Sequence, residues 1–450
     1  MYIPATAKER EEMLQRIGVG SIDELFASIP DRFVRSEPLS LPPALTEWEL
    51  TRHLGELSAR NASADQAVMF LGAGAYDHFV PAVVDTIASR SEYYTAYTPY
   101  QAEVSQGTLQ VGFEFQSLVC SLTGLDVSNT SLYEGATALV EGVNLALGAT
   151  GRPARILMSE GVHPEYRQTL ATYRAGLPTE LVTIPLLDGE TDWKALSREL
   201  DERTAAVVPQ SPNFLGTIES VAEGVRLARG SGALTIQVFD PMSLGLLPRP
   251  GDIGVDVAVA EGQSLGTPLA YGGPYLGLFA CKSEHMRRVP GRIVGETTDR
   301  QGRRCFVLTL QTREQHIRRD KATSNICSNQ ALLALRASVY LSLMGPAGMR
   351  EVAELCWHKA HYAAERLSSV DGLKVKSSSP FFKEFVIETP APAEQYVEPL
   401  LSLGYHAGVP LGRWYPDRSH QMLVAVTEKR SRAEIDGLAS AWEEVLRKVS

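Results

Sequence analysis

Short apolar runs separated by stretches of helical periodicity characterise the chain from about residue 68 to residue 282. The runs contain four to six residues with little polar alternation, which is typical of strands that helices cover on both faces. Their number and spacing predict a mostly parallel sheet in an α/β domain. The expected strands span residues 68–71, 155–158, 181–184, 205–208, 234–239, 255–259 and 276–280.

The pattern changes at both ends of the chain. Beyond residue 329, an apolar helix (331–343) ends at Gly345-Pro346, and strands at 385–387 and 422–426 precede a final helix from Arg432. In the first 60 residues, three hydroxyl and carboxylate pairs can cap helix starts, namely Thr6 with Glu9, Ser21 with Glu24 and Thr46 with Glu49. We therefore expect a helical arm (1–60), a large α/β domain (61–328) and a small C-terminal α+β domain (329–450).

Composition narrows the classes of function. With 450 residues, 44% of them hydrophobic, the chain can bury a large core. A net charge of -10 offers no basic field to a phosphate backbone, so we expect no nucleic-acid partner. We see neither a signal peptide nor an unbroken apolar span of about 20 residues, and we expect no membrane contact and a cytoplasmic location. Five scattered cysteines fit buried thiols in a reducing compartment, namely Cys120, Cys281, Cys305, Cys327 and Cys356.

Three short motifs match known signatures without the structural context that each needs. The glycine-rich loop 72–77 follows a strand, but Asp77 replaces the third glycine of a dinucleotide-binding loop, which favours a tight turn. Ser264 lies in a G-x-S-x-G match, but prolines and glycines replace the helix that a serine hydrolase requires after it. His358 and His361 share a helical face without a third ligand, so we expect a solvated face and no metal there.

Residues 93–103 have the most unusual composition in the chain, with four tyrosines in eight positions. A tyrosine combines an apolar ring with a hydroxyl that needs a partner, which is common in the wall of a substrate pocket or in an interface. A buried aromatic loop is the alternative. The segment is our first candidate for a binding surface.

Two further positions suggest a phosphate-bearing cofactor. Residues 131–138 place small side chains at the start of an apolar helix, where free amides could bind phosphate, although Glu134 puts a negative charge there. Asp240 ends an apolar run, where a carboxylate could hold the pyridine nitrogen of pyridoxal phosphate protonated. The next strand should then lead to a lysine that binds the cofactor covalently, but it leads to Glu261-Gly262-Gln263-Ser264.

The segment 311–327 is dense in cations and hydroxyls and precedes the long apolar helix. Its side chains could bind phosphate or carboxylate on this chain or on a neighbour. A solvated run of charges is the alternative.

Four motifs together carry a resemblance to a known family. They read YTPYQAE at 97–103, LYEGATA at 132–138, GTP at 266–268 with YGGP at 271–274, and KATSNIC at 321–327. In this order, they resemble the glycine dehydrogenase (decarboxylating) family, specifically its subunit 1 chains, which correspond to the N-terminal half of the long P-protein. The resemblance spans essentially the whole chain. It implies a fold of the aspartate aminotransferase type (fold type I, pyridoxal-phosphate-dependent transferases), with a mixed, mostly parallel sheet.

The resemblance also implies an activity and partners. Members of the family act as glycine dehydrogenase (aminomethyl-transferring) in a heterotetramer of two such chains with two copies of subunit 2. The complex uses pyridoxal phosphate to remove the carboxyl group of glycine as carbon dioxide. It passes the remaining aminomethyl group to the lipoyl arm of the H-protein of the glycine cleavage system.

The resemblance further assigns expected roles to residues. In subunit 2 chains, the lysine that holds the cofactor lies in a His-Lys-Thr motif before a Thr-Pro and a glycine run. When Gly266-Thr267-Pro268 of this chain is aligned with that motif, Gln263 falls at the position of the lysine. An amide cannot form a Schiff base, and Lys282 lies beyond the following strand, so the partner is expected to hold the cofactor and this chain to carry no catalytic residue of its own. The expected wall of the glycine site comprises Tyr94, Tyr97, Thr98, Tyr100 and Gln101, and the residues expected near the phosphate or the interface are Lys321, Thr323, Ser324 and Asn325.

Two other hypotheses compete with this one. The chain could be a non-catalytic scaffold that stabilises the partner and docks the H-protein. It could also be an independent pyridoxal-phosphate enzyme that uses another lysine.

Overall fold

The computed structural model describes the chain except for residues 1–4, 36, 153–154, 327, 377–378 and 450. It divides into two units, Met1–Ala62 and Ser63–Ser450. Within the described part, the α-helices are α1 (Ala7–Ile17), α2 (Glu47–Ser58), α3 (Ala82–Ala88), α4 (Ser91–Tyr94), α5 (Gln106–Thr123), α6 (Gly135–Thr150), α7 (Pro164–Arg174), α8 (Trp193–Glu199), α9 (Val221–Ser231), α10 (Gln315–Arg318), α11 (Ala331–Ser368), α12 (Glu394–Ser402) and α13 (Arg432–Val449).

The first unit is a helical arm. Complete capping boxes begin α1 at Thr6 and α2 at Thr46, as predicted. The third expected box is incomplete, because the Glu24 carboxylate accepts from the Gly20 amide while the Glu24 amide donates to Ser21. None of the residues of α1 and α2 is buried.

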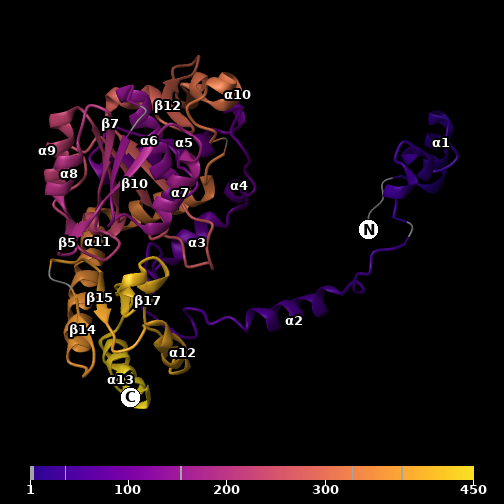
Figure 1. Cartoon of the computed structure of the whole chain (residues 1–450). Helices are drawn as coiled ribbons and strands as arrows, with labels where there is room; N and C mark the ends of the chain where they lie inside the picture. The colour runs from indigo at the N-terminus through magenta and orange to yellow at the C-terminus, as the bar shows by residue number, and fades with distance from the viewer. Residues whose placement is uncertain (1–4, 36, 153–154, 327, 377–378, 450) are drawn as a thin grey trace. The chain divides into compact units, whose positions relative to one another are not determined.

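The second unit contains a large mixed sheet in the order β2-β11-β10-β9-β7-β3-β4 (Figure 1), with β8 paired beside β9. Strand β11 is antiparallel to both of its neighbours, and the other pairs are parallel. This confirms the predicted mostly parallel sheet. Its strands are β2 (Val127–Ser128), β3 (Arg155–Ser159), β4 (Glu180–Ile184), β7 (Thr204–Val208), β8 (Gln210–Ser211), β9 (Leu234–Phe239), β10 (Val257–Glu261) and β11 (Gly277–Cys281).

Alternate side chains of the central strands point to opposite faces, and helices cover both faces. Val257 and Val259 of β10 pack in the apolar cluster that contains residues of α6 and α7. Ala258 and Ala260 pack on the other face, with residues of α5 and α11. This two-sided burial explains why the strands lack polar alternation.

One of the expected strands lies elsewhere. Strand β1 (Val68–Met69) pairs in parallel with β16 (Tyr405–His406) and takes no part in the large sheet. The prediction for residues 68–71 was therefore wrong in placement, because an apolar run reports burial and not the identity of the neighbouring strand.

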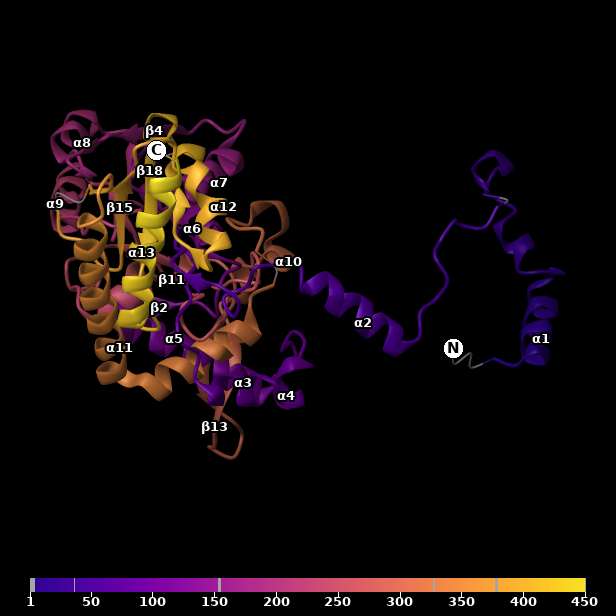
Figure 2. The ribbon, with the colours of Figure 1, turned by 90° about the horizontal axis from the view of Figure 1, so that it is seen from below.

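A smaller antiparallel sheet follows in the order β14-β15-β18-β17, and Figure 2 shows α13 between α11 and α12 beside it. One apolar cluster, which includes Phe385, Leu438 and Trp442, joins this sheet to these helices. The strands are β14 (Lys374–Val375), β15 (Glu384–Glu388), β17 (Val409–Pro410) and β18 (Gln421–Ala425). Two short antiparallel pairs complete the description, β5 (Leu186–Leu187) with β6 (Glu190–Thr191) and β12 (Ile293–Thr298) with β13 (Arg304–Thr309).

Helix α11 packs against both the large sheet and the small sheet of the second unit. Its backbone leaves helical geometry at Gly345 (φ 57°), which confirms the helix end predicted before Pro346, and a second helical segment follows. By length and apolar content α11 is the one described helix that could cross a membrane. However, its apolar residues pack in the clusters of both sheets, as in a core helix.

The predicted boundary between residues 328 and 329 stays a prediction, because the two compact units divide at residue 62.

Candidate functional site

The carboxyl ends of β9 and β10 open on a pocket between the large sheet and the start of β15. Functional groups gather at such an edge because every parallel strand ends there in a loop. We call this pocket the closed pocket, because polar groups in its lining pair with one another. Its lining includes Tyr76, His163, Tyr166, Gln210, Asp240, Glu261, Lys383 and Glu384.

The centre of the closed pocket is an ion pair between Asp240 and Lys383. The Lys383 ammonium lies 2.8 Å from the Asp240 carboxylate, and the lysine side chain is only 1% exposed. The same nitrogen lies 3.4 Å from the centroid of the Tyr76 ring and 3.0 Å from Nε2 of His78. A buried charge of this kind requires such partners, because desolvation of an unpaired ammonium is costly.

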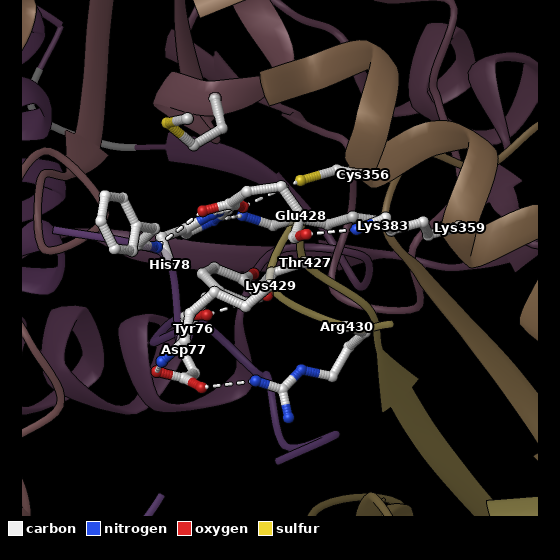
Figure 3. Close-up of polar contacts among 12 residues, drawn as sticks. Tyr76, Asp77, His78, Cys356, Lys359, Lys383, Thr427, Glu428, Lys429 and Arg430 are labelled. Carbon is white, nitrogen blue, oxygen red and sulfur yellow. Dashed lines mark hydrogen bonds and ion pairs between the residues drawn. The ribbon is translucent and has the colours of Figure 1, made fainter. Parts of the chain in front are cut away.

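A chain of buried polar groups continues from Lys383 (Figure 3). Nδ1 of His78 lies 2.6 Å from the Glu428 carboxylate, and the thiol of Cys356 donates to the same carboxylate at 3.4 Å. Burial opposes ionisation of Glu428, but the His78 ring and the Phe79 amide outweigh it and lower the pKa of Glu428 to about 2. The network joins the large sheet to the small one through charged groups.

The ligand atoms of His78, Cys356 and Glu428 lie within 4.8 Å of one another, a spacing that a metal ion could bridge. However, the Lys383 ammonium can only donate, so Nε2 of His78 accepts and Nδ1 carries the proton directed at Glu428. No lone pair on His78 is then free for a metal. The cluster is a hydrogen-bonded network within the described chain.

Gln263 lies just beyond β10 and is 1% exposed. Its side-chain carbonyl accepts from the Tyr76 amide at 2.9 Å, and its side-chain amide donates to the main-chain oxygens of Tyr76 (3.1 Å) and Thr267 (2.7 Å). The side chain therefore clamps two loops to each other. This is a structural role that a neutral amide can fulfil.

The start of α6, predicted as a possible phosphate site, is occupied by carboxylates of the chain itself. Glu134 accepts from the amides of Ala136 (2.6 Å) and Thr137 (2.9 Å). Glu261 accepts from the Gly135 amide at 3.0 Å. The first three amides of the helix thus already donate to carboxyl groups of the chain, which corrects the expectation that they are free. Burial raises the pKa of Glu261 to about 8.

Aromatic side chains fill much of the remaining wall. His163 stacks on Tyr166 with ring centroids 4.7 Å apart, and its Nε2 lies 2.9 Å from the Ala73 carbonyl. Burial lowers the pKa of His163. These rings narrow the space that is left in the pocket.

Taken together, the residues of the closed pocket and of the loops beside it do not fit pyridoxal phosphate. Asp240 is paired with Lys383, the helix amides are paired with Glu134 and Glu261, and Gln263 is bound to the main chain. Lys282 lies at the opposite edge of the sheet, beside the amino end of β10, where it pairs with Asp256.

The tyrosine segment forms part of a different hollow. We call it the tyrosine hollow; its lining includes Tyr93, Tyr94, Tyr97, Pro99, Leu109, Arg292, Asn329 and Leu332. Tyr94, Tyr97 and Tyr100 are 58%, 87% and 60% exposed, so the alternative of a buried aromatic loop is wrong. Tyr100 lies beside the hollow, with the Arg292 guanidinium 5.7 Å from its ring centroid. Thr98 and Gln101 are on the same segment but outside the described lining.

The basic segment lines a third hollow. Thr323, Ser324 and Asn325 lie there with Arg174 and Arg319, whereas Lys321 is exposed outside the lining. Ser324 hydrogen-bonds with Glu141, whose pKa burial raises to about 7. The structure therefore does not bring this segment into the tyrosine hollow within a single chain.

Several smaller predictions can also be placed. Asp77 pairs with Lys429 (2.7 Å) and Arg430 (3.0 Å), which agrees with a structural turn at 72–77. His361 stacks on Phe381 with ring centroids 4.1 Å apart. Cys281 and Cys356 are buried, Cys120 and Cys305 are half-buried, and Cys327 lies outside the described residues.

Sequence reasoning missed Lys383, His78 and Glu428. The available signal was Lys383-Glu384 inside the apolar run from Phe381 to Ile387, since charged residues in a buried strand need partners.

Comparison with solved structures defines the class. The fold is that of the pyridoxal-phosphate-dependent enzymes of fold type I, with a mixed large sheet and a smaller C-terminal α+β part. A glutamate decarboxylase from Lactobacillus brevis matches with a TM-score of 0.70 at 13% identity, over 93% of this chain and 96% of that chain, and shows the fold alone. A glycine decarboxylase (P-protein) of the glycine cleavage system, in inhibitor-bound form, matches with a TM-score of 0.92 at 45% identity, over 99% of this chain and 100% of that chain.

The chain belongs to the glycine cleavage system P-protein family, which it matches over residues 1–442. A probable glycine dehydrogenase (decarboxylating) subunit 1 from Moorella thermoacetica is 51% identical over 445 residues, 99% of each chain. A protein of the same name from Prosthecochloris aestuarii is 51% identical over 436 residues, 97% of each chain.

Proposed function

We propose that this chain is subunit 1 of a glycine dehydrogenase (decarboxylating), the P-protein of the glycine cleavage system. With subunit 2, in a heterotetramer of two plus two chains, it decarboxylates glycine and transfers the aminomethyl group to the lipoyl group of the H-protein. Pyridoxal phosphate supplies an electron sink for the decarboxylation when it is bound in the complex. We place the complex in the cytoplasm.

The observation that carries this proposal is the state of Gln263 in a chain that matches the family over residues 1–442. The amide occupies the position proposed for the cofactor lysine and is held by the main chain of Tyr76 and Thr267. Because an amide cannot bind the cofactor covalently, subunit 2 holds it.

The contribution of this chain is a wall of the partner's active site. Tyr94 and Tyr97 lie in the lining of the tyrosine hollow, with Arg292 at its polar side. An arginine near exposed tyrosines suits a small carboxylate such as that of glycine. Thr98, Tyr100 and Gln101 extend the same wall.

The basic segment is proposed to face subunit 2 or the cofactor phosphate on it. Thr323, Ser324 and Asn325 share a hollow with two arginines, Arg174 and Arg319. Lys321 adds an exposed cation to the segment. Hydroxyls and cations together suit an anion carried by a neighbouring chain.

The test is reconstitution. The chain is purified alone, then with subunit 2, and each sample is assayed for retained pyridoxal phosphate and for glycine-dependent release of carbon dioxide with lipoylated H-protein. We expect both only when subunit 2 is present. Fixation of the cofactor by borohydride onto the isolated chain, with matching turnover, would support an independent enzyme and end the proposal.

Replacing Tyr100 by Phe tests the wall. The ring and its contact with Arg292 remain, but the hydroxyl is lost, so folding stays intact and turnover of the complex falls about tenfold if the hydroxyl contacts a charged group. The control is Tyr362→Phe, which removes a hydroxyl that donates to Asp436 in the small sheet layer. Equal turnover in wild type and Tyr100→Phe counts against the placement.

A scaffold function remains the second candidate, favoured by the arm, whose helices bury no residue of their own. Alanine changes at Tyr94 and Tyr97 separate the two functions. A scaffold loses assembly before turnover, whereas an active-site wall loses turnover in complexes that still assemble.

A further inference from the structure

We propose that this chain excludes pyridoxal phosphate from its own closed pocket, independently of the missing lysine at position 263. Lys383 and Glu261 do so from the lining of the pocket, and Glu134 does so from the adjacent start of α6. The inference rests on the proposed function in one respect, since it assumes that the cofactor of the complex belongs to subunit 2. It adds that three side chains occupy the positions where this fold could otherwise bind the ring nitrogen and the phosphate of a cofactor.

The Lys383 ammonium takes the place, opposite Asp240, of the protonated ring nitrogen of a bound cofactor. In a pyridoxal-phosphate enzyme, a carboxylate in the position of Asp240 faces that nitrogen. Here the Asp240 carboxylate lies 2.8 Å from the Lys383 ammonium. A pyridinium brought to the same carboxylate would meet a fixed cation at van der Waals distance.

Lys383 is also wrongly placed to bind the cofactor covalently. The aldehyde carbon of pyridoxal is para to the ring nitrogen, so it points away from the carboxylate that holds that nitrogen. Lys383 contacts Asp240 and His78 at the nitrogen end and is 1% exposed. Use of Lys383 as an alternative cofactor lysine conflicts with this geometry.

Glu134 and Glu261 replace the phosphate. They accept from the amides of Gly135, Ala136 and Thr137, which are the donors that the start of α6 could offer to an anion. Phosphate would have to displace two carboxyl groups of the chain and bind beside them. Repulsion and lost hydrogen bonds both oppose this.

The packing agrees with the charges. The stacked rings of His163 and Tyr166 line one side of the pocket. The polar groups that a cofactor would use therefore already have partners within the chain. The assembled enzyme then loads the cofactor only onto subunit 2.

The first experiment uses the Gln263→Lys variant of the full chain. The variant is incubated with pyridoxal phosphate, dialysed and treated with borohydride, and its mass is then measured by mass spectrometry. We expect no added mass, although a lysine is restored. Stoichiometric labelling of residue 263 would overturn the proposal. Circular dichroism and thermal unfolding verify that the variant is folded.

The second experiment removes the excluding charges. The double variant Glu134→Gln with Lys383→Met is titrated with pyridoxal phosphate, and we expect affinity to rise at least tenfold over wild type. The control is Glu165→Gln, which removes a carboxylate from the first turn of α7 that accepts from none of the amides at the start of α6 described above. A folded double variant with wild-type affinity would overturn the proposal.

If the double variant does not fold, Glu134→Gln alone is titrated with inorganic phosphate. Glu134 is only half-buried, and glutamine keeps one oxygen for the helix amides. We expect affinity to rise about tenfold, and unchanged affinity would refute the role of Glu134.

These outcomes are separable from failure of the proposed function. That function fails if the wild-type isolated chain retains the cofactor and turns over glycine. The inference fails if the cofactor enters the Gln263→Lys variant with no other change, or stays out after the charges are removed.

Discussion

The closed pocket and the tyrosine hollow differ in what covers their polar groups. In the closed pocket, Asp240 and Lys383 pair with each other, and Glu428 of the adjoining network binds His78. In the tyrosine hollow, Tyr94, Tyr97 and Tyr100 are more than half exposed. The comparison teaches that the pocket at the carboxyl ends of the parallel strands can be filled by pairs within the chain, while the exposed aromatic surface lies elsewhere.

The physical reason is the cost of buried charge. A carboxylate that no longer faces a cofactor must find another cation, be replaced or stay unpaired at a large cost. Lys383 provides that cation for Asp240. Exposed tyrosine rings carry no comparable cost, so they can remain uncovered until a partner binds.

The largest expected effect is that of Lys383→Met. The change leaves Asp240 buried opposite an apolar side chain, and we expect it to lower the free energy of unfolding by about 3–5 kcal/mol. Adding Asp240→Asn should recover much of this loss, because the unpaired charge is removed. Urea denaturation of the two variants and wild type measures both effects.

The matched control is Lys376→Met. Lys376 pairs with Glu388, but these side chains are 45% and 33% exposed, so the loss should stay within about 1 kcal/mol. Equal losses for Lys376→Met and Lys383→Met would remove the distinction between buried and exposed pairs on which the comparison depends.

The next effect is that of Glu428→Gln, and it depends on pH. The pKa of Glu428 is lowered from 4.5 to about 2, so its ionised form stabilises the fold above pH 4.5 and this contribution is lost as the pH falls through 2. At pH 7 the variant should be less stable by up to about 3 kcal/mol.

Denaturation at pH 7, 4 and 3 tests this prediction. The gap between wild type and Glu428→Gln should narrow as the pH falls. His78 and Cys356 contact the carboxylate, Lys359 donates to the main-chain carbonyl of Glu428, and Lys383 contacts His78. All four residues remain in both proteins. A gap of constant size would show that the charge of Glu428 does not stabilise the fold.

The smallest effect on the chain itself is that of Tyr97→Ala. Tyr97 is 87% exposed, so stability should change by no more than about 0.5 kcal/mol. Glycine-dependent release of carbon dioxide by the complex should nevertheless fall about tenfold. Leu187→Ala, at a residue that is 58% exposed and outside the hollow, should change neither quantity. Loss of stability without loss of turnover would show that Tyr97 stabilises the fold and is not part of the active-site wall.

Much of the fold could be predicted because burial leaves a pattern in the sequence. Runs such as 155–158 and 234–239 became β3 and β9, and the break at Gly345-Pro346 was visible as a helix end. The partner of β1 could not be predicted, because His406 lies more than 300 positions away and nothing local specifies the pair.

The site was less predictable, because it depends on contacts between distant segments. The sequence singled out Asp240, Glu134 and Gln263 but not the side chains that satisfy them. Lys383 meets Asp240 from another layer of the fold, and Glu261 meets the start of α6 across 126 positions. Only the assembled structure shows that these groups are already paired.

The short pair of β1 and β16 has a consequence for how this protein can be divided. The amides of Val68 and Phe70 donate to the carbonyls of Gly404 and His406, each at 2.8 Å. Strand β1, near the beginning of the second unit, therefore pairs with a strand that is translated near the end of the chain. A recombinant fragment that stopped near residue 330 would leave these amides without acceptors. Residues 63–450 should therefore be kept together in any gene fusion, split or circular permutation of this protein.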